Sequence, residues 1–138
     1  MRKVKAIGIL AMVATMFALG GCFLFPNHPP IAAFTPIYNV DSQDPLVVRL
    51  DASTSSDPDG DQIVAYMWTF FQADGQPADV TIIPQDYTAT TTDPTITVDF
   101  QVEGTYTVTL VVRDARGKDS EPVSIDVTVP PEETNPTE

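Results

Sequence analysis

Three aspartates alternate in the turn SSDPDGD: Asp57, Asp59 and Asp61. Carboxylate oxygens from alternate positions of a glycine-containing loop are the ligands that wrap Ca²⁺ in many proteins. The turn is not an EF-hand loop, because Gly60 stands at its fourth position and Trp68 occupies the place of the bidentate glutamate. The alternative is that these aspartates cap the backbone of an ordinary surface turn. The calcium hypothesis predicts that millimolar Ca²⁺ raises the melting temperature and that Asp59→Ala abolishes the gain.

The other reactive side chains do not form a catalytic set. Cys22 is the single cysteine and His28 the single histidine. Nucleophilic catalysis needs a nucleophile with a base beside it, and no serine stands in a Gly-x-Ser-x-Gly turn. Partners for general acid–base chemistry are equally scarce. The sequence therefore predicts a protein that is not an enzyme and has no cofactor other than the calcium considered above. His28 is expected to be a solvated linker residue.

The N-terminal segment has the organisation of a secretory signal. A stretch with Arg2, Lys3 and Lys5 precedes the apolar run AIGILAMVATMFAL, which is shorter than the roughly 20 apolar residues of a membrane span. The run ends in Leu-Gly-Gly-Cys at 19–22, which resembles the lipobox of bacterial lipoproteins. That resemblance implies a signal peptide over residues 1–21 and acylation of Cys22. The alternative, an ordinary signal peptide, would leave an unpaired thiol in an oxidising compartment.

Removal of residues 1–21 would change the charge balance. The remaining chain has four basic and nineteen acidic residues, a net charge of −15. Such a chain repels nucleic acid and anionic headgroups, so we expect no nucleic-acid partner and a membrane contact made by the acyl chains on Cys22. Residues 22–29 then form a short tether. The absence of aspartate at Phe23 resembles the outer-membrane sorting rule, so we expect a lipid-anchored envelope protein whose domain lies outside the cytoplasm.

From Ile31 onward, apolar residues alternate with polar ones in short segments separated by turn residues, the pattern of an all-β sandwich. A weak edge or loop is expected over Tyr87–Asp93 and a disordered tail over 130–138. Tyr106 follows Gly104 by two residues, the position of a tyrosine corner in immunoglobulin-like sandwiches. We predict one antiparallel Greek-key domain over residues 30–129. Its seven or so strands are Ile31–Tyr38, Leu46–Asp51, Gln62–Gln72, Asp79–Ile83, Thr95–Phe100, Gly104–Asp114 and Val123–Val129.

The strand that carries the single tryptophan has two different faces. Val64, Tyr66, Trp68 and Phe70 share one face at period two, and we expect them in the core. The alternative for Trp68, Tyr66 and Tyr106 is a stacking platform for sugars. Met67 and Phe71 lie on the opposite face, where an exposed apolar patch would mark a contact surface. A neighbouring strand or the segment 76–84 would equally cover them.

Several stretches together resemble the polycystic-kidney-disease (PKD) domain, an immunoglobulin-like sandwich found on bacterial and archaeal surface proteins. In place of that family's Asp-Phe-Gly-Asp-Gly run after the tryptophan, this chain has Thr69 and a longer turn. In the PKD-like domains that bind calcium, the missing aspartate takes part, so its loss weighs against a metal site here. The matching stretches are PIAAF at 30–34, LDAS at 50–53, SDPDG at 56–60, Ile63, Tyr66, Trp68, GTYTVTLVVRD at 104–114 and Gly117.

The resemblance implies adhesion, spacing, or contact with proteins or polysaccharides. We therefore expect a non-catalytic envelope lipoprotein that presents a PKD-like module for binding an envelope protein or a polysaccharide. The alternative is a structural spacer or an accessory subunit of a larger cell-envelope complex. A subunit would migrate in a large detergent-resistant complex, and a free-standing adhesin would not.

Overall fold

The computed structural model describes residues 26–83 and 89–131. The predicted signal peptide, the acylation site Cys22 and most of the predicted tail lie outside the described residues. Within the described ranges, no helix is long and apolar enough to cross a membrane.

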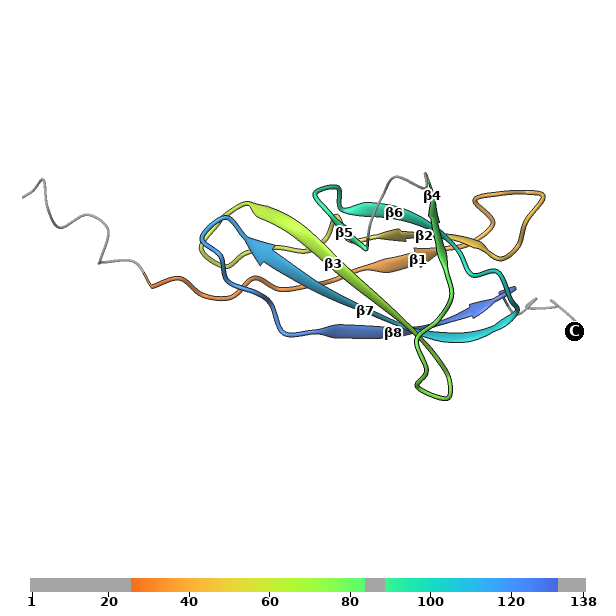
Figure 1. The fold of residues 1–138 in the computed structure, drawn as a ribbon. Helices are drawn as coiled ribbons and strands as arrows, with labels where there is room; N and C mark the ends of the chain where they lie inside the picture. Colours follow the sequence, from red (N-terminus) through yellow and green to blue (C-terminus); the bar gives the residue numbers. More distant parts are fainter. Residues whose placement is uncertain (1–25, 84–88, 132–138) are drawn as a thin grey trace, which may run out of the picture.

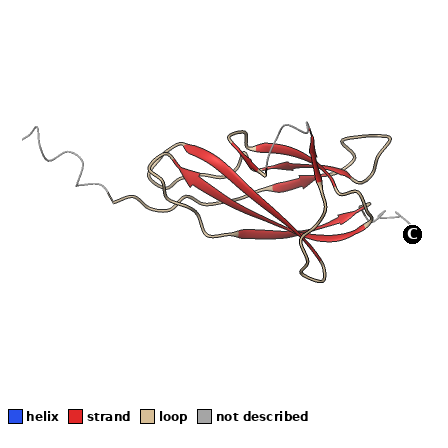
Figure 2. Cartoon of the chain, in the orientation of Figure 1, coloured by secondary structure: helices blue, strands red, loops and turns tan. Residues whose placement is uncertain are grey.

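Over those two ranges the chain forms two antiparallel sheets of four strands each (Figures 1 and 2). Neighbouring strands are often distant in sequence, as Greek-key connections require. This confirms the predicted all-β immunoglobulin-like sandwich. The first sheet has the order β1 (Thr35–Ile37), β2 (Val47–Asp51), β6 (Thr95–Asp99) and β4 (Thr81–Ile83). The second has the order β5 (Thr90–Thr91), β3 (Ile63–Gln72), β7 (Gly104–Asp114) and β8 (Val123–Val129).

The strand bounds differ from the prediction at two places. The expected weak edge over Tyr87–Asp93 contains β5, an eighth strand that pairs with the middle of β3. The expected first strand is divided, because Ile31 forms an isolated bridge to Ser56 and regular pairing begins only at β1. Pro36 has no N–H to donate, and β1 accordingly lies at the edge of its sheet.

The core lies between the sheets, where inward residues alternate along each strand. Trp68 is 2% exposed and packs edge-on against Phe34, with ring centroids 5.1 Å apart. Tyr66 and Tyr106 are also buried, so the sugar-platform interpretation of these three aromatics is wrong. The prediction for Val64 is wrong as well: a β-bulge between Ile63 and Ala65 shifts the register, and Val64 is exposed.

The predicted tyrosine corner is confirmed. The Tyr106 hydroxyl donates hydrogen bonds to the carbonyl oxygens of Val102, at 2.7 Å, and Phe100, at 3.2 Å. These bonds hold the loop between β6 and β7 against the start of β7. Because the hydroxyl is buried, they also satisfy a polar group that would otherwise be costly to remove from water.

The two ends of the sandwich are distinct, and β7 connects them. Its eleven residues span about 34 Å at the usual strand rise. We call the end at Asp114 the tether end, because residues 26–30 approach it, and the end at Gly104 the far end. Loops 52–62 and 114–122 lie at the tether end, and loops 38–46, 73–80 and 100–103 lie at the far end. Figure 1 shows the chain entering at the tether end and finishing at the far end.

Candidate functional site: an acidic cluster at the tether end

The turn before β3 is built around one carboxylate. Oδ1 of Asp57 accepts hydrogen bonds from the backbone amides of Asp59, at 2.8 Å, and Asp61, at 3.2 Å. Gly60 has a φ of 79°, a left-handed conformation that glycine adopts without strain. The capping role that the sequence suggested for this turn is therefore present. The other carboxylate oxygen of Asp57, Oδ2, takes no part in these hydrogen bonds.

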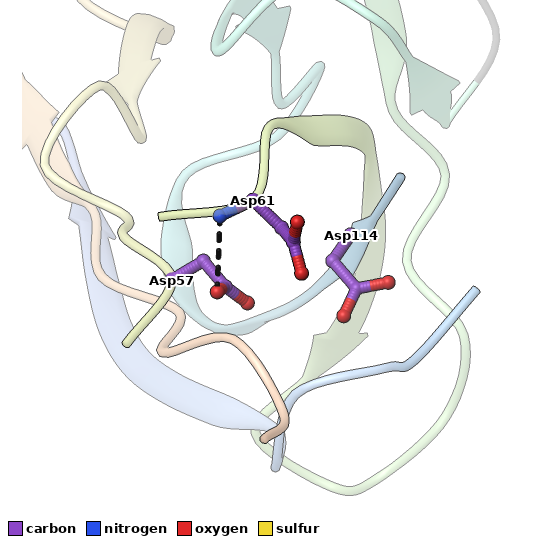
Figure 3. A group of neighbouring side chains, drawn as sticks. All are labelled: Asp57, Asp61 and Asp114. Carbon is purple, nitrogen blue, oxygen red and sulfur yellow. Dashed lines mark hydrogen bonds between the residues drawn. The ribbon is translucent and has the colours of Figure 1, made fainter. Parts of the chain in front are cut away.

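A carboxylate distant in sequence completes the cluster. Asp57, Asp61 and Asp114 each place an oxygen within 4.8 Å of the others, and Figure 3 shows the three side chains converging. Asp114 reaches the turn because β7 pairs antiparallel with β3 and Ile63 lies opposite Asp114. Asp57 and Asp61 were predicted from the sequence as candidate ligands, whereas Asp114 was not.

Asp59, the third aspartate of the predicted set, does not join this cluster. Its carboxylate accepts hydrogen bonds from the backbone amide of His28, at 2.6 Å, and pairs with Nδ1 of the same residue at 2.8 Å. The bond from the His28 amide, followed by that from the imidazole, lowers the pKa of Asp59. His28 is solvent-exposed as predicted, but it is fixed to the domain and does not act as a free linker residue.

Asp114 is the most buried member of the cluster, at 1% exposure. Its Oδ1 accepts hydrogen bonds from the amides of Arg116 and Lys118, each at 2.8 Å, and its Oδ2 accepts one from Nδ2 of Asn27 at 3.0 Å. Burial opposes ionisation, but these hydrogen bonds outweigh it and lower the pKa of Asp114. The Lys118 ammonium also bonds to the Asn27 carbonyl, so Asp114 and its turn hold the incoming chain.

The donor set of this cluster suits a hard divalent cation. Two buried oxygens in or beside the cluster have no partner among the described residues: Oδ2 of Asp57, which belongs to one of the three carboxylates, and Oδ1 of Asn27. Oxygen-only ligands of this kind are those that Ca²⁺ prefers. Arg116 lies 3.4 Å from Asp61 and partly offsets the negative charge. If Ca²⁺ binds, Asp57, Asp61 and Asp114 would hold it, with Asn27 as the available neutral donor.

The lowered pKa values give this end of the domain a defined response to acid. Because Asp59 and Asp114 are easier to ionise in the folded state, their stabilisation is complete above the unfolded pKa of about 4 and is lost as the pH falls below it. We expect the melting temperature to fall as the pH drops below about 4. Thermal unfolding at a series of pH values measures this.

The matched control for that acid response is Asp114→Asn. Protonation also relieves repulsion in an acidic chain, so the wild-type curve contains an opposing contribution. The Asp114→Asn variant lacks the titrating carboxyl of Asp114 but keeps the repulsion among the other acidic side chains. Its melting temperature should therefore depend less steeply on pH. Equal slopes for the two proteins would show that Asp114 carries none of the effect.

The outward face of the second sheet carries the predicted contact residues. Phe71 is 38% exposed, and Met67 on the same face is half-buried. The segment at Pro77 bridges to Phe71 along the edge of β3 without covering its side chain completely. Beside these two side chains, hydrogen-bonded polar pairs cross from β7 to β8. They are Thr105–Thr128 at 3.0 Å, Thr107–Asp126 at 2.9 Å and Thr109–Ser124 at 2.8 Å.

Comparison with known proteins gives a family match over most of the chain. Residues 27–129 match the family described as "PKD domain". The PKD1 domain of Vibrio anguillarum Epp is 24% identical with a TM-score of 0.52, over 75% of this chain and 96% of that one. The PKD1 domain of the Vibrio cholerae metalloprotease PrtV is 29% identical with a TM-score of 0.47, over 73% of this chain and 99% of that one.

A third solved structure has a described ligand class. It is presented as "Structural basis for the promiscuous specificity of the carbohydrate-binding modules from the beta-sandwich super family". The two chains are 31% identical, with a TM-score of 0.52. The match covers 75% of this chain but only 35% of the other. No curated protein matches the sequence.

Proposed function

Because the chain belongs to the PKD domain family, we propose that it is a non-catalytic lipoprotein of the bacterial envelope that binds a surface protein or polysaccharide. Acylated Cys22 attaches it to a membrane, more specifically the outer membrane where two membranes exist. Residues 22–26 lead from this anchor to the tether end. The domain then extends away from the bilayer, with its outward sheet faces accessible.

The observation that carries the binding role is the outward face of the β5-β3-β7-β8 sheet. An exposed aromatic ring, Phe71, shares this face with Met67, from which Thr69 separates it, and lies opposite Thr107, whose hydroxyl donates to Asp126 on β8. This combination of an apolar surface with fixed hydroxyl groups suits sugars and polar protein surfaces alike. The likeness to a structure of carbohydrate-binding modules supports the polysaccharide arm of the proposal.

Cross-linking in living cells tests the proposal, with three forms of the full-length protein compared: wild type, Cys22→Ala and Phe71→Ser. Phe71→Ser is expected to remain folded but to lose about 1–2 kcal/mol of stability, because the ring is 38% exposed and otherwise packed. It should nevertheless lose most of the cross-linked partner. Ile83→Ser, at an apolar side chain of similar exposure on β4 of the other sheet, is the matched control and should retain it.

The adducts are then digested with protease or with glycan-degrading enzymes. Discrete protease-sensitive adducts that require Cys22 indicate an envelope protein, and a heterogeneous glycan-sensitive smear indicates polysaccharide. Unchanged capture by Phe71→Ser contradicts the assignment of this face. If wild type captures nothing, the alternative of a spacer is favoured. A large detergent-resistant complex would favour the accessory-subunit alternative.

A second candidate role, calcium binding at the tether end, is favoured by the unpartnered oxygens of Asp57 and Asn27. The cluster joins the incoming chain to the turns before β3 and after β7. Ca²⁺ at this position would stiffen the junction between the membrane anchor and the domain. The bound ion would then fix the orientation of the binding face relative to the membrane anchor.

A further inference from the structure

A groove opens at the far end of the sandwich, at the opposite end from the acidic cluster and next to the end of the Phe71 face, where Thr105 belongs to both. It has a volume of about 560 Å³, within the usual range for ligand sites. Its walls are the turn after β3, at Gln72–Asp74, and the loop at 101–106, with Asp79 between them. Hydrogen bonds from Gln72 to Gln76 and from Tyr106 to Val102 fix both walls, so the groove is formed in the free protein.

The lining of the groove combines apolar surface with carboxylates. Val102 is 64% exposed and lies with Ala73 along the groove. Asp74, Asp79 and Glu103 are exposed at its rim. A ligand that matches both features needs an apolar stem and a positive end.

The distribution of charge over the described residues strengthens this requirement. The far-end loops and the strand ends that lead into them carry no lysine, arginine or histidine. Arg49 lies in the middle of β2, and the ion pairs His28–Asp59, Arg113–Asp119 and Arg116–Asp61 all lie at the tether end. The acidic side chains at the far end are Asp41, Asp44, Asp74, Asp79, Asp99 and Glu103. Their charge is therefore balanced only by solvent ions in the free protein.

Sugars fit this groove less well than they fit the Phe71 face. Tyr106 is the single aromatic residue among those that line the groove, and it is 5% exposed with its hydroxyl committed to two carbonyls. No ring is available there for stacking on a pyranose. Lysine and arginine, in contrast, place an aliphatic stem on apolar surface while their charged ends meet carboxylates.

We propose that the far-end groove binds a lysine- or arginine-containing segment of a partner protein. The aliphatic stem of a basic side chain lies along Val102 and Ala73, and its cation meets Asp79 and Glu103. Neither Phe71 nor Met67 lines this groove, so it adds a second contact to the proposed binding module and does not depend on those two side chains.

Fluorescence anisotropy with the purified full-length protein tests the proposal. The probe is a short labelled peptide rich in lysine and arginine, and its lysine-acetylated, arginine-to-glutamine counterpart is the uncharged control. The double variant Asp79→Asn with Glu103→Gln should weaken binding about fivefold or more. The matched double variant Glu121→Gln with Asp126→Asn removes the same charge away from the groove and should weaken it much less. Phe71→Ser should bind as wild type does.

Four outcomes would overturn the proposal. The first is no binding of the basic peptide by wild type at low salt. The second is equal weakening by the two double variants, which would mean that only net charge attracts the peptide. The third is equal binding of the uncharged peptide. The fourth is tighter binding of spermidine than of the peptide, which would show a site for free polyamines and not for a protein segment.

Discussion

Replacing Trp68 with alanine is expected to destabilise the domain by about 3–5 kcal/mol, the usual cost of truncating a buried tryptophan. The side chain is 2% exposed, and its ring packs edge-on against Phe34, in the segment that leads into β1. Truncation would remove this contact and leave a cavity that the surrounding strands cannot close. Since small domains have a total stability of about 5–15 kcal/mol, much of the margin would be lost. Urea unfolding followed by circular dichroism measures the difference.

Two further variants distinguish packing from other causes. Nε1 of Trp68 is buried with no hydrogen-bond partner among the described residues, so Trp68→Phe breaks no hydrogen bond and should cost only the lost volume. Phe71→Ala, on the opposite face of the same strand, should cost far less than Trp68→Ala because its ring is already 38% exposed. Similar losses for Trp68→Ala and Phe71→Ala would contradict the assignment of the two faces.

The bounds of several strands could be predicted from the sequence because their pattern is local. β7 and β8 have the predicted ends, since alternating apolar residues and flanking turn signals are read along a single segment. The bulge at Val64 could not be predicted in this way. The bulge adds one residue to β3 relative to β7, so that the side chain of Val64 points outward. Its cause is the pairing between the two strands, which no single segment of sequence reveals.

The candidate site was predictable only in part for the same reason. Asp57 and Asp61 stand in one turn, and their spacing is visible in the sequence. Asp114 ends a strand 53 residues after Asp61, and no local pattern links them. The link is the antiparallel pairing of β3 with β7, which places the end of one beside the start of the other. Asp59 was predicted to be a ligand because spacing alone does not reveal that its carboxylate is hydrogen-bonded to His28.

Calcium is expected to raise the melting temperature, and the effect should depend on Asp114. At ten times the dissociation constant, ligand binding stabilises a protein by about 1.4 kcal/mol. For a domain of this size that corresponds to an increase of about 5–10 °C. Differential scanning fluorimetry in millimolar Ca²⁺ and in EDTA measures it. The physical reason is that a divalent cation would relieve the repulsion between three carboxylates within 4.8 Å.

Two isosteric variants separate the cluster from the rest of the acidic turn. Asp114→Asn removes one of the converging carboxylates and should abolish the calcium shift, measured against the variant's own melting temperature in EDTA. Asp59→Asn should keep most of the shift, because its carboxylate is paired with His28 and lies outside the cluster. This differs from the expectation from sequence alone, in which Asp59 is a ligand. Loss of the shift in Asp59→Asn with retention in Asp114→Asn would restore that expectation. No shift in wild type would mean that the carboxylates serve only to hold the tether and the turn.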